Sequence, residues 1–493
     1  MSTGEDNDVL PTEECDIVHT TWTAAAPDYA KAQAANKSYQ NFPLGKPKNV
    51  GQKPEHQTVA FIKREEDGDV VELTNGQVRT EPKRNKSFDH VDAFYDEMIE
   101  NDNLEQPFKL TNTVLETSHK QPIYAAAFNH YQKGNRAQLA TAAREMISVY
   151  DCSVDYHDLS LVRSFVDNNS EESYFAITWC YDVVAQRSLI VAGGYSAFIK
   201  VIDPANGELV QELWGHGDVI NEIRTDPSNS MIIASVSKDT TVRIWNIRVG
   251  LCLVVFGGIE GHMDQVLSCD WSPDSRFLVS CGMDHSVRMW YITPAARDLI
   301  AFSLQREGEA TLRCYRPGHH ANKSLPTKHI YYPNAWTTDL HCDYVDCVRF
   351  VGWHLISKGS ERVANIYRFG HHNEPYDQVF RIKADSACTR IAQLNLPACD
   401  VWFLKFDIDP VGRWVVFGSK SGHLHFFNIR DRDSPEGDAD YVVRVGNSPI
   451  RQVAFGASGR ILIAVTDDYE IFKLERNVLN DYGSQKKINA SSV

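Results

Sequence analysis

The 493-residue sequence lacks the motifs of common enzymes and has no segment suited to span a membrane. Its apolar runs fall well short of the ~18 residues that a membrane-spanning helix needs. The N-terminal stretch MSTGEDNDVLPTEECD is acidic where a secretory signal would be basic and then apolar, so we do not expect export. A G-x-S-x-G elbow, a phosphate-binding loop and an H-E-x-x-H zinc motif are also missing. These absences favour a non-catalytic protein that needs no cofactor, metal or membrane.

Paired cysteines are missing as well. The chain has 11 cysteines, an odd number, and none of them forms a C-x-x-C pair. Most lie in apolar, strand-like stretches such as LSCDW and VSCGM, which favours buried thiols in a reducing compartment over disulfides or a zinc site. Two His-His pairs, at 319–320 and 371–372, stand alone in polar loops, so a metal site there is the less favoured alternative.

Positive charge is scarce, above all near the N-terminus. The formal net charge is -15, and residues 1–106 carry 21 Asp and Glu against 11 Lys and Arg, a net charge of -10. An acidic chain does not favour broad contacts with phosphate groups, so we expect no sequence-specific binding of DNA. The charge instead suits a basic partner, such as a basic peptide.

Residues 1–106 also lack sustained apolar periodicity and carry polar runs such as KREEDGD and EPKRNK, which predicts a mostly disordered acidic arm. One segment, DHVDAFYDEMIEN at 89–101, has apolar residues at helical spacing, namely Val91, Phe94, Tyr95, Met98 and Ile99. This short amphipathic helix would dock either on the rest of the chain or on a partner. At the other end, residues 477–493 are predicted to form a flexible tail.

Two stretches from residue 107 onward can be laid over each other, GHGDVINEIRTDPSNSMIIASVSKDTTVRIWNI and GHMDQVLSCDWSPDSRFLVSCGMDHSVRMWYI. A repeat of ~40 to 45 residues that starts with Gly-His and ends a strand with Trp is typical of WD-repeat propeller blades, each a four-stranded sheet. Inside each blade a buried imidazole, hydroxyl, carboxylate and indole must satisfy one another. We therefore interpret two sets of side chains as structural rather than catalytic: His216, Ser235, Asp239 and Trp245, and His262, Ser280, Asp284 and Trp290.

Weaker copies of the repeat bring the number of predicted blades to seven, so the sequence predicts an all-β, seven-bladed WD-repeat β-propeller over residues 107–476. The segment PFKLTNTVLE at 107–116 reads as a strand that would complete the last blade and close the ring, which removes an exposed sheet edge. The Pro-, His- and Lys-rich stretch at about 306–336 is predicted to be an insertion between the fourth and fifth blades.

The segment CDVWFLKFDID at 399–409 reads as a β-strand with two large rings, Trp402 and Phe403, on opposite faces. The first strands of all blades align on an apolar anchor, and the residue four positions earlier should lie at one rim of the central channel. Those residues are Tyr124, Phe175, Asn221, Leu267, Asp346, Trp402 and Arg451.

Four aromatic residues of this rim belong to neighbouring blades: Tyr124, Phe175, Trp402 and Phe403. Ring faces that converge at a solvent-accessible mouth attract a quaternary ammonium group, each face contributing ~0.5 to 2 kcal/mol. The sequence therefore suggests a methyl-lysine cage, the alternative being that these rings are ordinary packing residues. Residues across and beside the mouth are candidates for contacts with a peptide: Asn221, Asp346 and Arg451.

Several strings resemble one family closely: YVDCVRF, FGGIEGH, VLSCDW, SCGMDHS, VSKDTTVRIWNI, CDVWFLKF and ILIAVTDD are similar to the embryonic ectoderm development and extra sex combs family. Members of that family are the non-catalytic propeller subunit of Polycomb repressive complex 2, a nuclear histone lysine methyltransferase that represses transcription. The resemblance implies a scaffold that binds the SET-domain (enhancer of zeste type) subunit, and with it the other subunits of the complex, on one face and reads a trimethylated histone lysine on the other.

The family's cage positions fall on the same four residues that the strand alignment selects, and Arg451 matches a family position at the histone-peptide face. The sequence departs from the family pattern at the first cage position, usually Phe and here Tyr124, and at the second and fourth, usually Tyr and here Phe175 and Phe403.

Two other classes of function remain as alternatives. The segment IWNIR, which ends in Arg248, resembles the W-D-x-R box of propellers that serve as substrate receptors of cullin ubiquitin ligases, although Asn246 replaces the Asp of that box. An enzyme is the third possibility, and it would show activity in the isolated chain.

Overall fold

The computed structural model describes residues 106–116, 120–132, 137–152, 159–305, 325–370, 388–431 and 435–477, together with the backbone of strand β1 (His19–Thr21). The predicted helix at 89–101, both His-His pairs and residues 478–493 lie outside these described residues, as does the N-terminal arm apart from β1. Within the described ranges, no helix is long and apolar enough to cross a membrane.

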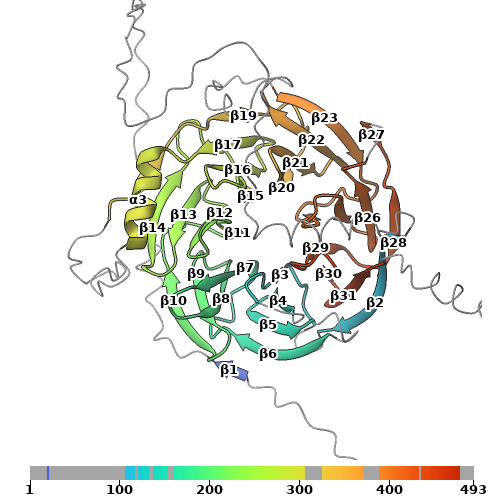
Figure 1. Ribbon diagram of the computed structural model, residues 1–493, viewed down its shortest axis with the longest axis horizontal. Helices are drawn as coiled ribbons and strands as arrows, with labels where there is room; N and C mark the ends of the chain where they lie inside the picture. Colours follow the sequence, from blue (N-terminus) through green and yellow to red (C-terminus); the bar gives the residue numbers. More distant parts are fainter. Residues whose placement is uncertain are drawn as a thin grey trace, which may run out of the picture. The chain divides into compact units, whose positions relative to one another are not determined.

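Seven sheets in the described part of the chain stand as blades around a central channel, with the first strand of each blade innermost (Figure 1). The first blade contains β3 (Ala125–Phe128), β4 (Gln138–Ala143), β5 (Met146–Asp151) and β6 (Ser160–Val166), and β1 pairs in parallel with β6. The second contains β7 (Tyr174–Asp182), β8 (Arg187–Gly194), β9 (Ile199–Asp203) and β10 (Glu208–Leu213). The third contains β11 (Ile220–Thr225), β12 (Ile232–Ser237), β13 (Val242–Asn246) and β14 (Leu251–Phe256).

The remaining blades follow the same order of strands. The fourth contains β15 (Val266–Trp271), β16 (Phe277–Gly282), β17 (Val287–Tyr291) and β19 (Ala335–Thr337). The fifth contains β20 (Val345–Val351), β21 (His354–Gly359), β22 (Val363–Phe369) and β23 (Cys388–Asn395), with β27 (Glu436–Gly437) added in parallel. The sixth contains β24 (Asp407–Ile408), β25 (Trp414–Gly418), β26 (His423–Asn428) and β28 (Tyr441–Arg444). The seventh contains β29 (Ile450–Phe455), β30 (Ile461–Thr466) and β31 (Glu470–Arg476).

Strand β2 (Phe108–Leu115) closes the ring, as the sequence predicts. It pairs antiparallel with β31 and becomes the outer strand of the seventh blade, so the two ends of the propeller share one sheet. Phe108 is buried and stacks on Phe426 of the sixth blade, with the ring centroids 5.5 Å apart. The closing strand therefore also adds apolar contacts to the neighbouring blade.

The insertion predicted at about 306–336, between the fourth and fifth blades, has a different place in the order of the strands. Helix α3 (Pro294–Gln305) follows β17 and packs against the outer strand of the third blade. Strand β18 (Lys328–Ile330) pairs in parallel with β14, and β19 pairs with β17. In chain order the insertion therefore falls between the third and fourth strands of the fourth blade, because β19 completes that blade. Such a short outer strand carries too little apolar pattern to be recognised in the sequence.

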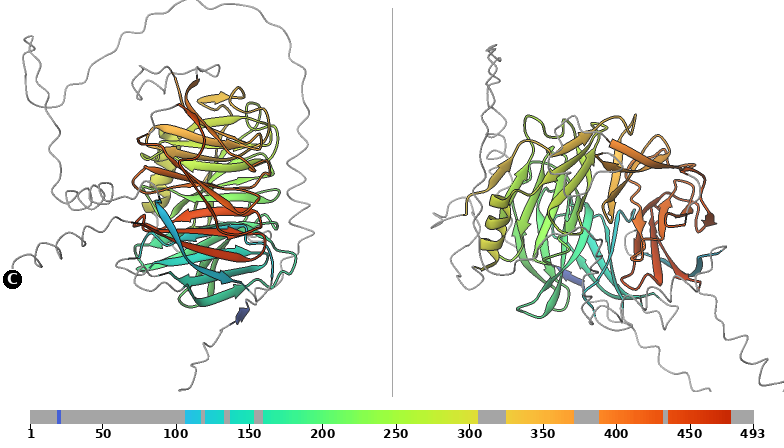
Figure 2. Two further views of the ribbon diagram at one scale, coloured as in Figure 1. Left: turned by 90° about the vertical axis from the view of Figure 1, so that its right-hand side faces the viewer. Right: turned by 45° about the horizontal axis from the view of Figure 1, so that its top comes forward.

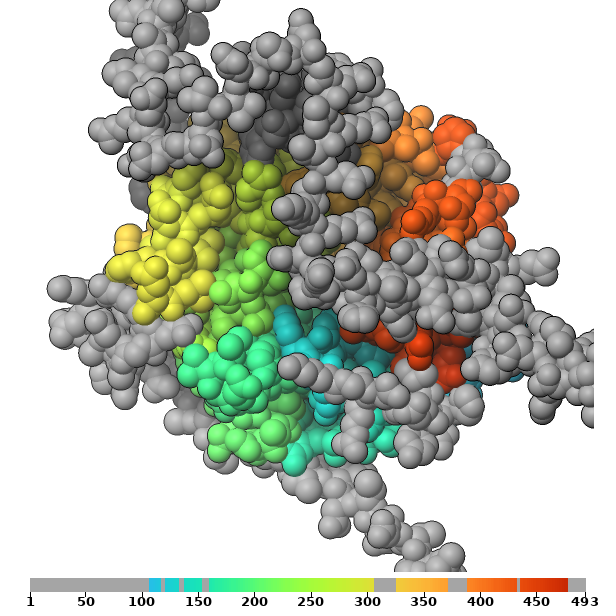
Figure 3. All heavy atoms as spheres, in the orientation of Figure 1, coloured from blue at the N-terminus to red at the C-terminus, as the bar shows by residue number. Residues whose placement is uncertain are grey.

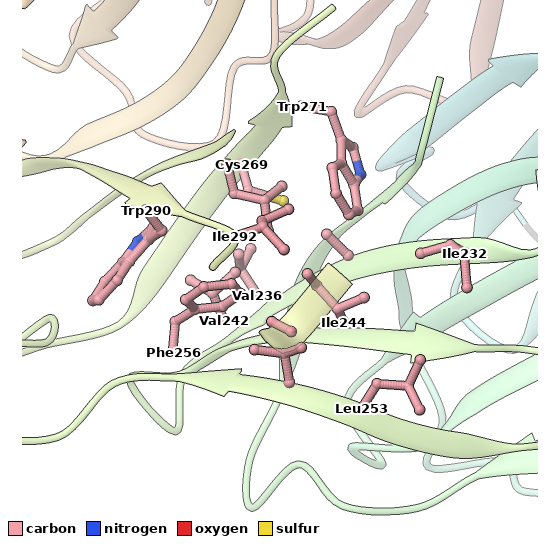
Figure 4. Packing of buried hydrophobic residues seen from close by; sticks show 14 of the residues in the cluster. Ile232, Val236, Val242, Ile244, Leu253, Phe256, Cys269, Trp271, Trp290 and Ile292 are labelled. Atoms are coloured by element: carbon pink, nitrogen blue, oxygen red, sulfur yellow. The ribbon is translucent and has the colours of Figure 1, made fainter. Parts of the chain in front are cut away.

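The core lies between adjacent blades, where the face of one sheet packs on the face of the next. Figure 2 shows these sheets from the side, and Figure 3 shows neighbouring blades as a continuous surface from teal through green to yellow. The cluster in Figure 4 joins the third and fourth blades, and Ile232, Val236, Trp271 and Trp290 belong to it. A strand between two such layers is buried on both faces, which explains why β12 and β16 read as nearly continuous apolar or small residues.

Hydrogen bonds join the polar side chains inside the third blade. His216 Nδ1 lies 2.8 Å from Asp239 Oδ2, and His216 Nε2 lies 2.7 Å from Ser235 Oγ. The Trp245 indole donates to the same hydroxyl at 2.8 Å. Burial lowers the pKa of His216 against the opposing effect of Asp239, so the ring is neutral at pH 7. Hydrogen bonds thus connect all four side chains with one another, as in a structural network.

The fourth blade repeats this network, and the fifth contains a third version that the sequence analysis missed. His262 contacts Asp284 and Ser280, and Trp290 Nε1 donates to Ser280 Oγ at 2.8 Å. In the fifth blade His341 Nε2 lies 2.7 Å from Ser357 Oγ, and Nδ1 contacts Glu361. Glu replaces Asp there and no Gly precedes the His, and the His-to-Ser spacing is 16 residues rather than 19 or 18, so the sequence carries no clear signal for this copy.

Candidate functional site

The inner strands share a local irregularity at the rim positions. The pairing register shifts by one residue at the start of β7, β11, β15, β20 and β29. The extra residue at each shift is the one predicted to lie at the rim when the first strands of the blades are aligned with one another: Phe175, Asn221, Leu267, Asp346 and Arg451. A β-bulge leaves its extra residue unpaired and redirects the side chain. Five blades therefore each place one unpaired residue at the same end of the channel.

Three of the four predicted cage rings pack together. The centroids of Tyr124 and Phe175 are 5.2 Å apart, and Phe403 lies 6.1 Å from Tyr124 and 5.9 Å from Phe175. The angles between the ring planes are 68°, 78° and 78°. The rings come from the first, second and sixth blades, which the closed ring brings together. Their planes are steeply inclined to one another, as the walls of a corner are.

Trp402 adds a fourth ring to this corner, and it is the exposed one. Its centroid lies 5.8 Å from that of Phe403, with 82° between the planes. Trp402 is 43% exposed, whereas Phe403 is 5% exposed. Of the two adjacent rings, Trp402 thus faces solvent beside a buried partner, so a ligand can reach the cluster from this side.

The predicted strand at 399–409 is mostly absent, because β24 comprises only Asp407 and Ile408. Phe403 has a φ of 65°, in the left-handed region, and this breaks the alternation of side chains that a strand would impose. Such a conformation costs about 1–2 kcal/mol for a residue other than Gly. Two hydrogen bonds hold the segment beyond it: Leu404 N–H donates to Asp346 Oδ2 at 3.0 Å, and Lys405 N–H donates to Arg451 O at 2.8 Å.

Two of the predicted peptide contacts are buried inside the propeller instead. Asp346 is 0% exposed and Asn221 4%. Lys358 Nζ donates to both carboxylate oxygens of Asp346 at 2.9 Å, and the Asn221 side chain donates to Val266 O at 2.8 Å. Both side chains are thus used inside the propeller rather than exposed at its mouth, where a contact with a peptide was expected. Their short side chains bond to neighbouring strands, and through Leu404 Asp346 supports the segment that carries the rings.

Arg451 lies partly exposed among the rings. Its guanidinium forms a two-point ion pair with Asp467, at 2.6 and 2.7 Å, and its Cζ lies 5.7 Å from the Tyr124 centroid. Nη1 also donates to Trp402 O at 3.3 Å. The ion pair with Asp467 fixes the guanidinium, which in turn holds the backbone carbonyl of Trp402 and lies over the ring of Tyr124. Arg451 thus links the seventh blade to rings of the first and sixth.

Lys405 is a component of the site that the sequence analysis missed. This buried side chain places Nζ 4.6 Å from the Phe403 centroid and donates to Asn221 O, from the third blade, at 2.7 Å. Nζ also lies 3.8 Å from Glu222 Oε1. Burial lowers the pKa of Lys405, and Glu222 opposes that effect. A lysine among apolar inner-strand residues, as in FLKFDI, was the signal in the sequence.

Glu222 connects this lysine to the fifth blade. Its Oε1 accepts from Arg349 Nη2 at 2.7 Å, and Ser268 donates to its other oxygen. Burial alone would raise the pKa of Glu222, but Arg349 and Lys405 outweigh it and hold the pKa at about 2. The three charged side chains line a cavity of about 330 Å³ at the far ends of the inner strands. In the described part of the chain no group of three His, Cys, Asp or Glu residues is arranged to hold a metal ion.

Arg248, the residue of the alternative cullin-receptor motif, forms an ion pair with Asp182 of the second blade. Its side chain is mostly buried in this contact between blades. The motif therefore has a structural use in this protein.

The model of the WD domain, G-beta repeat, matches residues 207–246 and 251–291, which cover most of the third and fourth blades. The Chaetomium thermophilum Polycomb repressive complex 2 contains a chain of similar fold, with a TM-score of 0.62 and 18% identity over 76% of this chain and 99% of that one. This likeness supports the propeller fold.

Two curated relatives are more similar in sequence. The Polycomb protein esc of Drosophila melanogaster is 31% identical over 371 residues, 74% of this chain and 84% of the relative. The Polycomb protein mes-6 of Caenorhabditis elegans is 32% identical over 431 residues, 75% of this chain and 92% of the relative. The resemblance read from the sequence is thereby confirmed, and the chain belongs to the extra sex combs family of Polycomb WD-repeat proteins.

Proposed function

We propose that this protein is a non-catalytic, nuclear subunit of a histone methyltransferase complex of the Polycomb repressive complex 2 type, and that it reads a trimethylated histone lysine. The observation that carries the proposal is the gathering of Tyr124, Phe175, Trp402 and Phe403 at one end of the channel. The family membership supports the assignment to a Polycomb complex.

The chemistry of the cluster suits a trimethylammonium group. Such a group cannot donate a hydrogen bond, so a site recognises it through its charge and its methyl surface. Ring faces within about 6 Å supply both, and each contributes ~0.5 to 2 kcal/mol. The steep angles between Tyr124, Phe175 and Phe403 allow more than one face to meet the same cation. Trp402 offers a solvent-exposed wall at the entrance.

The surroundings suit a basic peptide. The net charge of the chain is -15, which attracts a histone tail over distance. The hydroxyl of Tyr124 takes the place of a family Phe, while Phe175 and Phe403 lack the hydroxyls usual there. We expect cation binding to persist, since the ring faces remain, and the choice of peptide to differ.

As a scaffold, the protein would hold the SET-domain subunit on the opposite face and the remaining subunits with it, and so support transcriptional repression. Co-expression with an enhancer of zeste type subunit tests this part. We expect a complex that survives size-exclusion chromatography. Separate elution of the two chains would remove the scaffold role.

A binding titration tests the reader. The purified chain is titrated with histone-tail peptides carrying zero, one, two or three methyl groups on one lysine, alongside Trp402→Ala. Tyr332→Ala is the matched control, because Tyr332 is also a large exposed ring but follows β18 at the outer edge of the third blade. We expect affinity to rise with methylation, to fall in Trp402→Ala and to stay unchanged in Tyr332→Ala. Equal affinity for all methylation states would show that the rings are packing residues and do not form a cage.

A further inference from the structure

The Phe403 ring already has a cation beside it. The Lys405 ammonium lies 4.6 Å from the Phe403 centroid, well within the distance at which a ring face attracts a cation. The ammonium cannot move away easily, because it is buried and donates to Asn221 O across the channel at 2.7 Å. The ring is therefore shared between the candidate cage and an internal lysine.

The charge of Lys405 is only partly offset by its neighbours. Glu222 is the nearest carboxylate with a contact to it, at 3.8 Å, beyond hydrogen-bond distance. The same carboxylate is bonded more closely by Arg349, at 2.7 Å. Glu222 thus serves two cations, Arg349 and Lys405, and lies nearer to Arg349. Two other buried carboxylates of the region have partners of their own, since Asp346 pairs with Lys358 and Asp270 with Arg224.

We propose that Lys405 is a specificity-determining residue that lowers the affinity of the ring cluster for cations relative to neutral groups of the same shape. The inference rests on the proposed reader function and adds a component to it. An ammonium at the Phe403 ring repels a second cation brought to the cluster, and it draws on the same π-electron density. In a poorly solvated interior this repulsion is not screened by salt as it would be at the surface.

The test is a pair of titrations on Lys405→Gln. Glutamine removes the charge and keeps an N–H group that can donate to Asn221 O. One histone-tail peptide carries trimethyllysine, and the other carries its neutral carbon isostere, with a tert-butyl group in place of the trimethylammonium group. For two charges separated by the ring and partly offset by Glu222, we expect trimethyllysine to bind about three- to tenfold more tightly in Lys405→Gln. The isostere should bind within about twofold of the wild type, since it carries no charge to repel.

Two further variants guard against a change in packing. Lys405→Arg keeps the charge and should leave the preference between the two peptides as it is in the wild type. Lys405→Met removes the charge without adding an amide, and it replaces Lys405→Gln if the latter fails to fold. Thermal unfolding of each variant shows whether it is folded.

The outcomes separate the inference from the function it rests on. If the wild type binds trimethyllysine and removal of the Lys405 charge leaves the preference unchanged, the inference is overturned and the reader function stands. An equal gain in affinity for the trimethyllysine peptide and for the neutral isostere also overturns the inference, because a change in packing and not in charge then explains the gain. If the wild type binds neither peptide but the neutral variant binds trimethyllysine, the inference holds and the reader function fails. If no variant binds, both fail.

Discussion

The polar networks inside the blades and the rings at the rim are built on the same strand framework but behave as opposites. In the third blade His216, Ser235, Asp239 and Trp245 bond to one another and leave little for a ligand. At the rim, Trp402 keeps an exposed face, and Tyr124 and Phe175 are only partly covered. A closed set of partners stabilises a fold, whereas an incomplete one is available for binding.

The two regions also differ in how they vary from blade to blade. The same His-Ser pair with an acidic partner recurs in the third, fourth and fifth blades. The bulge position instead carries Phe175, Asn221, Leu267, Asp346 or Arg451, a different residue in each blade. In a repeat protein, the positions that repeat hold the units together, and those that differ at equivalent places are where a site can be built.

The largest effect is expected from Trp245→Ala, which removes a buried ring from the closed network. Loss of a large buried aromatic side chain costs about 3–5 kcal/mol, and here Ser235 also loses a donor. Denaturant unfolding should show the loss. The matched change at the rim, Trp402→Ala, should lower the free energy of unfolding by less than about 1 kcal/mol, since the ring is half exposed. Equal losses would erase the distinction between the two regions.

Asp346→Asn links the two regions, because Asp346 is a buried structural residue beneath the rings. It leaves Lys358 without its carboxylate, and breaking a buried ion pair costs about 3 kcal/mol or more. We also expect weaker trimethyllysine binding at temperatures where the variant is folded, since Leu404 N–H loses a charged acceptor. Unchanged binding would show that the 402–405 segment keeps its shape without this support.

Phe175→Ala should act on binding more than on folding. One ring face is worth ~0.5 to 2 kcal/mol, which corresponds to about a two- to thirtyfold loss of affinity for trimethyllysine. Affinity for the unmethylated peptide should change little, and calorimetric titration measures both. An equal loss for both peptides would assign Phe175 to general packing.

Acidification should lower the free energy of unfolding through the buried histidines of the networks. The pKa values of His216 and His262 are lowered by burial, so the unfolded chain binds more protons than the folded one just below pH 6.5. Stability is therefore retained at neutral pH and falls as the pH drops, by up to about 1.4 kcal/mol per pH unit for each histidine. His216→Gln should reduce this slope in pH-dependent unfolding. The same slope in that variant would place the titrating groups elsewhere.

Much of this architecture could be read from the sequence. The spacing of His216, Asp239 and Trp245 identifies a blade, and the apolar anchors locate the rim residues because the bulge comes four residues before the anchor in each of the five inner strands that have one. The closing strand β2 was also predictable, since a propeller has to cover its last sheet edge.

What the sequence did not disclose depends on contacts between blades. The left-handed backbone of Phe403 is held by Asp346 of the fifth blade and Arg451 of the seventh, so the local pattern still reads as a strand. The burial of Asn221 and the position of Lys405 follow from a hydrogen bond across the channel between residues 184 positions apart. Such partners are known only once the ring is assembled.

The most direct test of the central claim is proton NMR of a histone-tail peptide that carries trimethyllysine, observed at its N-methyl resonance during titration with the purified chain. Protons that lie over aromatic faces are shifted upfield. We predict an upfield shift in the wild type that is reduced in both Phe175→Ala and Trp402→Ala. An N-methyl resonance that stays in place while the peptide binds would contradict the cage.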